Sequence, residues 1–165
     1  MFLLFIITVS ITTALLPAIA PYVLKALGYE IKSGGWMLPL VASCLFFTSF
    51  YLPDIHISSQ TSTFQQHFVG GGIYSALLYF YIKRIFSWRF SLVIDLLLLF
   101  AWTSALGVAN KLLEFVLLKL HLLALDTTDA YWDLLANTLG AYTAYILFMM
   151  RVALGRSISS GRKHR

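Results

Sequence analysis

Charged residues are scarce in this chain: they make up 12% of its 165 residues, whereas hydrophobic residues make up 59%. A soluble globular domain carries roughly 25% charged residues. A shortage of this size argues against a soluble domain and predicts an integral membrane protein. The formal net charge of +5 would suggest a nucleic-acid partner if the protein were soluble. In a membrane protein the positive charge belongs to loops and tails, so we expect membrane lipid and no nucleic acid as partner.

Cysteine is also nearly absent. Cys44 is the only one, so the chain cannot form an intrachain disulfide, and we interpret Cys44 as a small apolar residue. The sequence has no Cys/His spacing typical of a zinc site, no nucleophile elbow, no phosphate-binding loop and no haem motif. Serine and threonine are plentiful, but no spacing among them indicates a catalytic triad.

Long apolar stretches account for most of the chain. A helix of about 20 apolar residues crosses a bilayer, and five stretches suit this role: 2–24, 36–52, 68–82, 90–118 and 131–150. No Lys or Arg precedes the first stretch, so we interpret it as a transmembrane helix and not as a cleavable signal peptide. The predicted fold is all-α: a polytopic bundle over residues 1–152, followed by a basic cytoplasmic tail at 153–165.

The distribution of basic residues predicts an orientation. If the N-terminus is outside and the C-terminus inside, ten of the twelve Lys and Arg residues lie on the cytoplasmic side. The opposite side then holds the loop 54–67, which lacks Lys and Arg, and the region 111–133. We therefore expect a multi-pass protein of the cell membrane with its N-terminus out and its C-terminus in.

A polar stripe opens the last apolar stretch. Asp126, Asp129 and Asp133 are three of the seven acidic residues, and Asn137 and Gly140 continue the stripe along one helix face. An unpaired charge in a membrane helix costs roughly 2.5–3.5 kcal/mol, so such a stripe should face protein, water or a ligand. It is either a functional site or a structural device, in which Asp129 complements the helix dipole and Asn137 makes an interhelical hydrogen bond.

Glu114 lies near the outer end of the fourth stretch and shares a helix face with Asn110. It is a candidate general base, metal ligand or proton carrier, because a carboxyl group in a dry site has a raised pKa. The alternative is an interfacial carboxylate that pairs with Lys111 or Lys119.

His67 opens the third stretch just before three consecutive glycines, Gly70 to Gly72. It is a candidate acid, base or metal ligand, or else a histidine that bonds to backbone at the start of a helix. On the other side of the membrane, Asp95 is expected to pair with Arg84 and Arg89.

Several of these elements resemble the VanZ-like superfamily of small membrane proteins. They are Gln66-His67-Phe68-Val69-Gly70-Gly71, then Glu114, then Asp126-x-x-Asp129-x-x-Trp132-Asp133-x-x-x-Asn137-x-x-Gly140, within residues 60–150. Relatives often place an acidic residue four before the histidine, where this chain has Thr63. The resemblance implies a role in the cell envelope and supplies no established reaction.

Two hypotheses for the function follow. In the first, Glu114, Asp133 and His67 carry the chemistry of an extracytoplasmic-side site that binds or acts on a lipid-linked or cell-envelope substrate. A divalent cation held by His67, Asp129 and Asp133 could assist, since carboxylate oxygens suit Mg²⁺ and histidine admits Zn²⁺. In the second, the same polar residues form a structural network or dock another membrane protein. Proton-coupled transport is less favoured, because Asp95 is the one acidic residue of a span in the cytoplasmic half.

Overall fold

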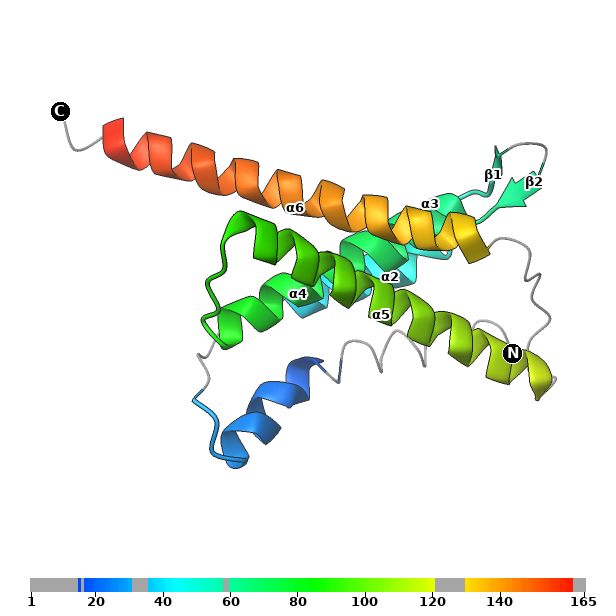
Figure 1. Cartoon of the computed structure of the whole chain (residues 1–165), viewed down its shortest axis with the longest axis horizontal. Helices are drawn as coiled ribbons and strands as arrows, with labels where there is room; N and C mark the ends of the chain where they lie inside the picture. Colours follow the sequence, from blue (N-terminus) through cyan, green and yellow to red (C-terminus); the bar gives the residue numbers. More distant parts are fainter. Residues whose placement is uncertain (1–14, 16, 31–35, 58–59, 121–129, 162–165) are drawn as a thin grey trace.

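The computed structural model describes residues 15, 17–30, 36–57, 60–120 and 130–161. These residues are mainly helical, which confirms the predicted class. A helical stretch at 17–26 comes first, shown in blue in Figure 1. The elements that follow are α2 (Met37–Ser49), β1 (Ile55–Ile57), β2 (Gln60–Ser62), α3 (Phe64–Gln66), the π-helix η1 (His67–Ile73), α4 (Tyr74–Ile85), α5 (Leu92–Lys119) and α6 (Ala130–Gly161).

The helix boundaries follow the predicted stretches closely. α2, α5 and α6 each begin within two residues of the predicted start. The third stretch, 68–82, lies inside a continuous helical segment that runs from Phe64 through η1 to Ile85. Residues 1–14, which hold most of the first stretch, lie outside the described residues.

α6 is longer than the last apolar stretch. It ends at Gly161, so the helix passes without a break through the predicted start of the basic tail at residue 153. No proline occurs between Arg151 and Gly161, and nothing in this segment forces the helix to stop. Figure 1 shows α6 running along most of the length of the molecule.

A short hairpin occupies the region that the sequence indicates as a polar loop. β1 and β2 are antiparallel, with Ile55 opposite Ser62 and Ile57 opposite Gln60. β-Branched residues such as isoleucine and threonine favour extended backbone, which explains strands in a segment this short. The hairpin leads directly into α3 and thus sets the position of His67 at the start of η1.

The segment η1–α4 is the centre of the packing. α6 packs mainly against η1, α2 packs against both η1 and α4, and α5 packs against α6 and α4. The buried core lies where α4, α5 and α6 meet and consists of Ala76, Tyr79, Phe80, Leu99, Ala141 and Tyr145.

Glycine permits the close approach of η1 and α6. A Cβ atom added to Gly72 would lie 2.7 Å from Gly140 Cα and 2.9 Å from Ala141 N. These contacts involve backbone atoms, which cannot rotate away as a side chain can. The two helices therefore touch backbone to backbone, as small residues allow in membrane helix pairs.

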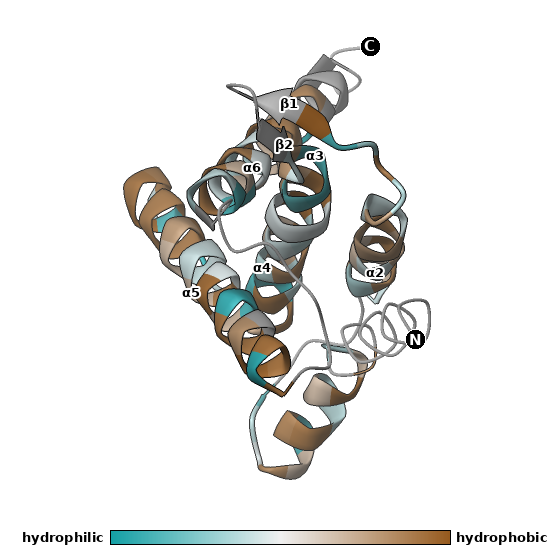
Figure 2. Cartoon of the chain, turned by 90° about the vertical axis from the view of Figure 1, so that its right-hand side faces the viewer, coloured by the Kyte–Doolittle hydropathy of each residue, from teal (hydrophilic) through white to brown (hydrophobic). Residues whose placement is uncertain are grey.

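Among the described residues, α5 is the one helix that is both long and apolar enough to cross a membrane. α2 is a shorter apolar helix. Figure 2 shows hydrophobic residues, in brown, along most of α5. The arrangement with five spans and an outer N-terminus stays a prediction.

Candidate functional site

A buried carboxylate in the first turn of α6 is the centre of the candidate site. The side chain of Asp133 is 2% exposed. Its Oδ2 lies 2.5 Å from Lys111 Nζ and 3.2 Å from His67 Nε2. Its Oδ1 accepts a hydrogen bond of 3.1 Å from the Thr63 hydroxyl. We refer to these four residues as the Asp133 cluster.

Three parts of the chain supply the Asp133 cluster. Thr63 precedes α3 and His67 begins η1, so the two residues belong to one helical turn, and the His67 N–H donates to Thr63 O over 3.0 Å. Lys111 comes from α5 and Asp133 from α6. The tight contact between η1 and α6 brings the His67 turn to Asp133, and α5 adds the lysine from the other side of α6.

The electrostatics of the Asp133 cluster follow from burial. An isolated carboxylate loses several kcal/mol on leaving water, and a lysine partner with additional hydrogen bonds offsets much of that loss. Lys111 supplies the opposite charge, whereas His67 adds a second positive charge only when it is protonated. The side chains of His67 and Lys111 are 14% and 28% exposed, so both reach the molecular surface while Asp133 does not.

The π-helical conformation of η1 occurs at the candidate site itself. π-Helical turns are rare and occur frequently at functional sites. In this chain the π-helix begins at His67 and continues through the three glycines to Ile73. The unusual backbone conformation thus begins at the residue that carries the candidate imidazole.

Asn137 lies one turn beyond Asp133 on α6. It is 6% exposed, and its Oδ1 has no hydrogen-bond partner in the described part of the chain. A Cβ atom on Gly71 would overlap this oxygen, so the Asn137 amide fills the space that the glycine leaves. The sequence suggests a hydrogen bond from Asn137 across helices, and for Oδ1 none is formed.

The other predicted residues have different surroundings. Gly140 packs against Phe68 O and Gly72 Cα, which is a backbone packing role. Asn110 is on an exposed face of α5. Glu114 belongs to α5, but the structure does not describe its side chain. Asp126 and Asp129 lie outside the described residues.

The proposed metal ligands His67 and Asp133 are neighbours, and Asp129 is not described. Over the described ranges, no group of three or more His, Cys, Asp or Glu residues gathers that could hold a metal ion. A divalent cation at Asp133 would need Asp129 or water, and it would compete with Lys111 for Oδ2.

A second buried carboxylate lies at the other end of the bundle. Asp95 in the first turn of α5 is 5% exposed and accepts hydrogen bonds from Tyr79, Lys83 and Tyr145, the last over 2.8 Å. We refer to these four residues as the Asp95 cluster. The cation of this cluster is Lys83. The expected pairing of Asp95 with Arg84 and Arg89 is therefore wrong.

The reason for the correction is the helical register. Lys83 is in the last turn of α4, and it reaches across to the first turn of α5. Arg84, the next residue, is exposed and directed to another face of the helix. Tyr79 is one turn before Lys83, which places its hydroxyl on the same carboxylate.

Sequence reasoning missed the contributions of Lys111 and Thr63 to the Asp133 cluster. One signal for Lys111 existed: a lysine within an apolar helix requires a partner, and Asp133 is predicted to lie on the same side of the membrane as Glu114. The Thr63 hydroxyl donates a hydrogen bond to the same carboxylate. No pattern in the sequence indicates Tyr79 or Tyr145.

The Asp133 cluster has the parts for proton transfer. A buried carboxylate beside an imidazole fixes the orientation of the ring and stabilises its protonated form. A nearby ammonium group can attract an anionic group of a bound molecule.

No protein-family model matches this chain, and no curated protein or solved structure is significantly similar to it.

Proposed function

We propose that this chain is a five-span protein of the cell membrane, VanZ-like in type, that binds or acts on a lipid-linked or cell-envelope substrate. The site is the Asp133 cluster, on the extracytoplasmic side. The observation that carries the proposal is the pair of contacts at one buried oxygen: Asp133 Oδ2 lies 3.2 Å from His67 Nε2 and 2.5 Å from Lys111 Nζ.

The distribution of polarity over α5 supports the membrane placement. Its buried positions include Asp95, Thr103 and Gly107, while Val93, Leu97 and Leu112 are more than 60% exposed. In water this arrangement would leave large apolar side chains hydrated. In a bilayer the same arrangement places apolar side chains against lipid and polar groups against protein, as membrane helices require.

The two ends of the bundle support the orientation. Figure 1 shows the α4–α5 turn at one end with the end of α6, and the hairpin with the start of α6 at the other. The first end carries Lys83, Arg84 and Arg89, and the C-terminal part of α6 adds Arg151 and Arg156, which suits the cytoplasm. The Asp133 cluster is at the second end, so the proposed site opens outward.

Within the site, we assign each residue a different role. His67 moves a proton to or from the substrate, since an imidazole changes charge near neutral pH. Asp133 is a positioning residue that holds the imidazole. Lys111 attracts an anionic group, for which phosphate is the natural candidate in a lipid-linked substrate. Glu114 of α5 is the third proposed catalytic residue.

A polyprenyl phosphate is the probe for this proposal. We expect it to raise the melting temperature of the purified full-length protein in detergent, and the polyprenol without phosphate to raise it less. The Lys111→Met/Asp133→Asn double variant keeps the interior neutral and should lose the difference between the two lipids. Lys119→Met, which removes an exposed lysine of the same helix, is the matched control.

Two results would contradict the substrate proposal. One is an equal shift with the phosphate and with the polyprenol. The other is an unchanged response of the double variant, which would remove Lys111 from phosphate binding.

A structural role is the second candidate, because the Asp133 cluster joins α5, α6 and the α3–η1 turn. In that case Asp133 stabilises the bundle, and His67 has no part in substrate chemistry. His67→Gln then distinguishes the two: it should leave the melting temperature near that of the wild type in both cases, but it abolishes turnover of an envelope substrate only if His67 carries a proton.

A further inference from the structure

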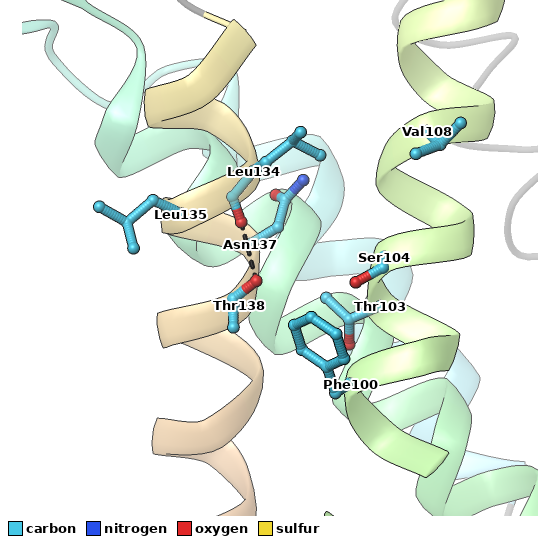
Figure 3. A pocket seen from close by; sticks show the side chains of 8 residues that line it. All are labelled: Phe100, Thr103, Ser104, Val108, Leu134, Leu135, Asn137 and Thr138. Carbon is cyan, nitrogen blue, oxygen red and sulfur yellow. Dashed lines mark hydrogen bonds between the residues drawn. The ribbon is translucent and has the colours of Figure 1, made fainter. Parts of the chain in front are cut away.

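A cavity lies between α5 and α6, about one helical turn from the Asp133 cluster. Its volume is about 430 Å³, within the range of roughly 300–1,000 Å³ for small-molecule sites. The walls include Phe100, Ser104 and Val108 from α5, and Leu134, Leu135 and Thr138 from α6 (Figure 3).

Two buried polar side chains complete the lining of the cavity. Thr103 is 1% exposed and Asn137 is 6% exposed, and Thr103 Oγ1 and Asn137 Oδ1 have no hydrogen-bond partner among the described residues. Figure 3 shows Asn137 on the side of α6 that faces α5. The Thr138 hydroxyl differs, since it donates to Leu134 O over 2.9 Å.

An unpaired buried polar group has an energetic cost of about 1–3 kcal/mol. A ligand that hydrogen-bonds to the Thr103 hydroxyl recovers part of this cost, whereas Asn137 Oδ1 lies against Gly71 of η1. Side chains can offer the ligand a donor or an acceptor, and Asn137 Nδ2, which lies on the side of Gly107 of α5, is a donor. A threonine hydroxyl can serve as both.

The lining also restricts the charge of a ligand. None of the residues that line the cavity is charged, and most of the lining is apolar. A carboxylate or phosphate in this space would lose its hydration without gaining a counterion. The polar part of the ligand should therefore be neutral, such as a hydroxyl or a carbonyl group.

The surroundings of the cavity indicate the source of the ligand. Phe100 and Val108 are 47% and 49% exposed, and Leu135 is 43% exposed. They belong to an apolar surface on α5, the candidate membrane span, and on the neighbouring face of α6. In the membrane placement proposed above, this surface faces the hydrocarbon of the bilayer, from which lipid molecules can enter.

The volume argues against a transmembrane helix as the occupant. A helix is about 10–12 Å wide with side chains and rises about 5.4 Å per turn, so one turn fills roughly 400–600 Å³. The cavity could hold only about one turn, whereas a spanning helix needs more than five. An apolar chain is narrower and can leave the rest of its length in the bilayer.

We propose that this cavity binds the apolar chain of a lipid that carries a neutral hydroxyl or carbonyl oxygen, which hydrogen-bonds to Thr103 and Asn137. The proposal rests on the membrane placement given above and not on proton transfer at Asp133. The lipid fills the space between α5 and α6, and its oxygen pairs with the Thr103 hydroxyl and Asn137 Nδ2.

Photolabelling in lipid nanodiscs tests the proposal with the full-length protein. The probe is a hexadecanol analogue with a photoreactive group on its chain, and mass spectrometry locates the label. We expect labelling of Phe100, Ser104 and Leu135, with displacement by hexadecanol and weaker displacement by hexadecane.

Two pairs of variants sharpen the test. Ser104→Phe fills the cavity and should reduce labelling about tenfold. Ala105→Phe places the same ring on the neighbouring exposed position of α5 and should leave labelling unchanged. Thr103→Val removes the hydroxyl at similar volume and should narrow the difference between hexadecanol and hexadecane.

The outcomes separate this proposal from the proposed function. Labelling spread evenly over the exposed faces of α5, or unchanged in Ser104→Phe, would overturn the cavity site. Equal displacement by hexadecane and hexadecanol would overturn the role of Thr103 and Asn137. If polyprenyl phosphate does not raise the melting temperature of the wild-type protein while the cavity is still labelled, only the proposal for the Asp133 cluster is refuted.

Discussion

Lys111 of α5 and Asp133 of α6 form an ion pair of 2.5 Å across two segments that are otherwise strongly apolar. Each residue would be costly in a membrane without the other. Together they fix α5 against α6, and His67 joins them through the same carboxylate oxygen. The pair therefore links the assembly of the bundle to the geometry of the proposed site.

The Asp133→Asn variant should lose stability because it leaves the Lys111 ammonium without a counterion. Breaking a buried ion pair from one side costs roughly 3–5 kcal/mol. Here the loss should be smaller, since Lys111 is 28% exposed and can turn toward water. Denaturant unfolding in detergent measures the free energy of unfolding. The double variant Lys111→Met/Asp133→Asn should recover part of the loss, and no recovery would mean that the two residues act independently.

The contact between η1 and α6 should be intolerant of any added side chain. In Gly72→Ala the new methyl group would meet backbone atoms of Gly140 and Ala141 at 2.7 and 2.9 Å. Overpacking of this kind costs about 1–3 kcal/mol or more, and the separation of the helices would also move His67 from Asp133.

Gly107→Ala is the matched comparison for Gly72→Ala. Its methyl group would meet side-chain atoms of Leu134 and Asn137 at 3.0 and 3.1 Å, and side chains can adjust. Melting temperatures in detergent should fall much more for Gly72→Ala. Equal melting temperatures for the two variants would show that the helices can separate at little cost.

The Tyr145→Phe variant tests the Asp95 cluster. It removes a 2.8 Å hydrogen bond to a buried carboxylate, and hydrogen bonds to charged groups contribute roughly 1.5–3 kcal/mol. Tyr142→Phe makes the same chemical change three residues earlier on α6, away from Asp95. Chemical unfolding should therefore show a clear loss for Tyr145→Phe alone. Similar losses in both variants would mean that the aromatic packing of α6, and not the carboxylate, is responsible.

Cysteine labelling tests the proposed orientation. In a Cys44→Ala background, Asp54→Cys and Arg89→Cys each place one thiol at an exposed position, on opposite sides of the membrane in our assignment. A membrane-impermeant maleimide should label the first in intact cells and the second only after permeabilisation. The reverse pattern would place the Asp133 cluster on the cytoplasmic side.

Helix positions could be predicted from the sequence because they depend on length and hydropathy. α2, α5 and α6 match the stretches at 36–52, 90–118 and 131–150 in their starting points. The charges of the loops predict that His67 and Asp133 lie on the same side of the membrane, and the structure brings the two side chains into contact. That argument gives the side but not the partner, and the sequence indicates Lys111 only as one of two possible partners of Glu114.

Other features depend on packing and could not be predicted. The π-helix in η1 depends on how closely three glycines let α6 approach, and hydropathy carries no information about it. The Asp95 cluster depends on which face of α4 meets α5, so Lys83 and Arg84, adjacent in sequence, have different roles. The cavity beside Asn137 is a property of the volume between two helices, to which eight lining residues contribute.

The π-helix also makes the spacing of the chain itself important. A π-helical turn holds one residue more than an α-helical turn, and one residue corresponds to about 100° of rotation in an α-helix. Deleting a single residue between Phe68 and Ile73 would let η1 relax into an ordinary α-helix while α4 kept its packing. Because the deleted residue is the one that the π-helical turn holds in excess, His67 would keep its direction toward α6, whereas the same deletion within the α-helical turns of α4 would rotate the His67 turn by about 100° away from Asp133.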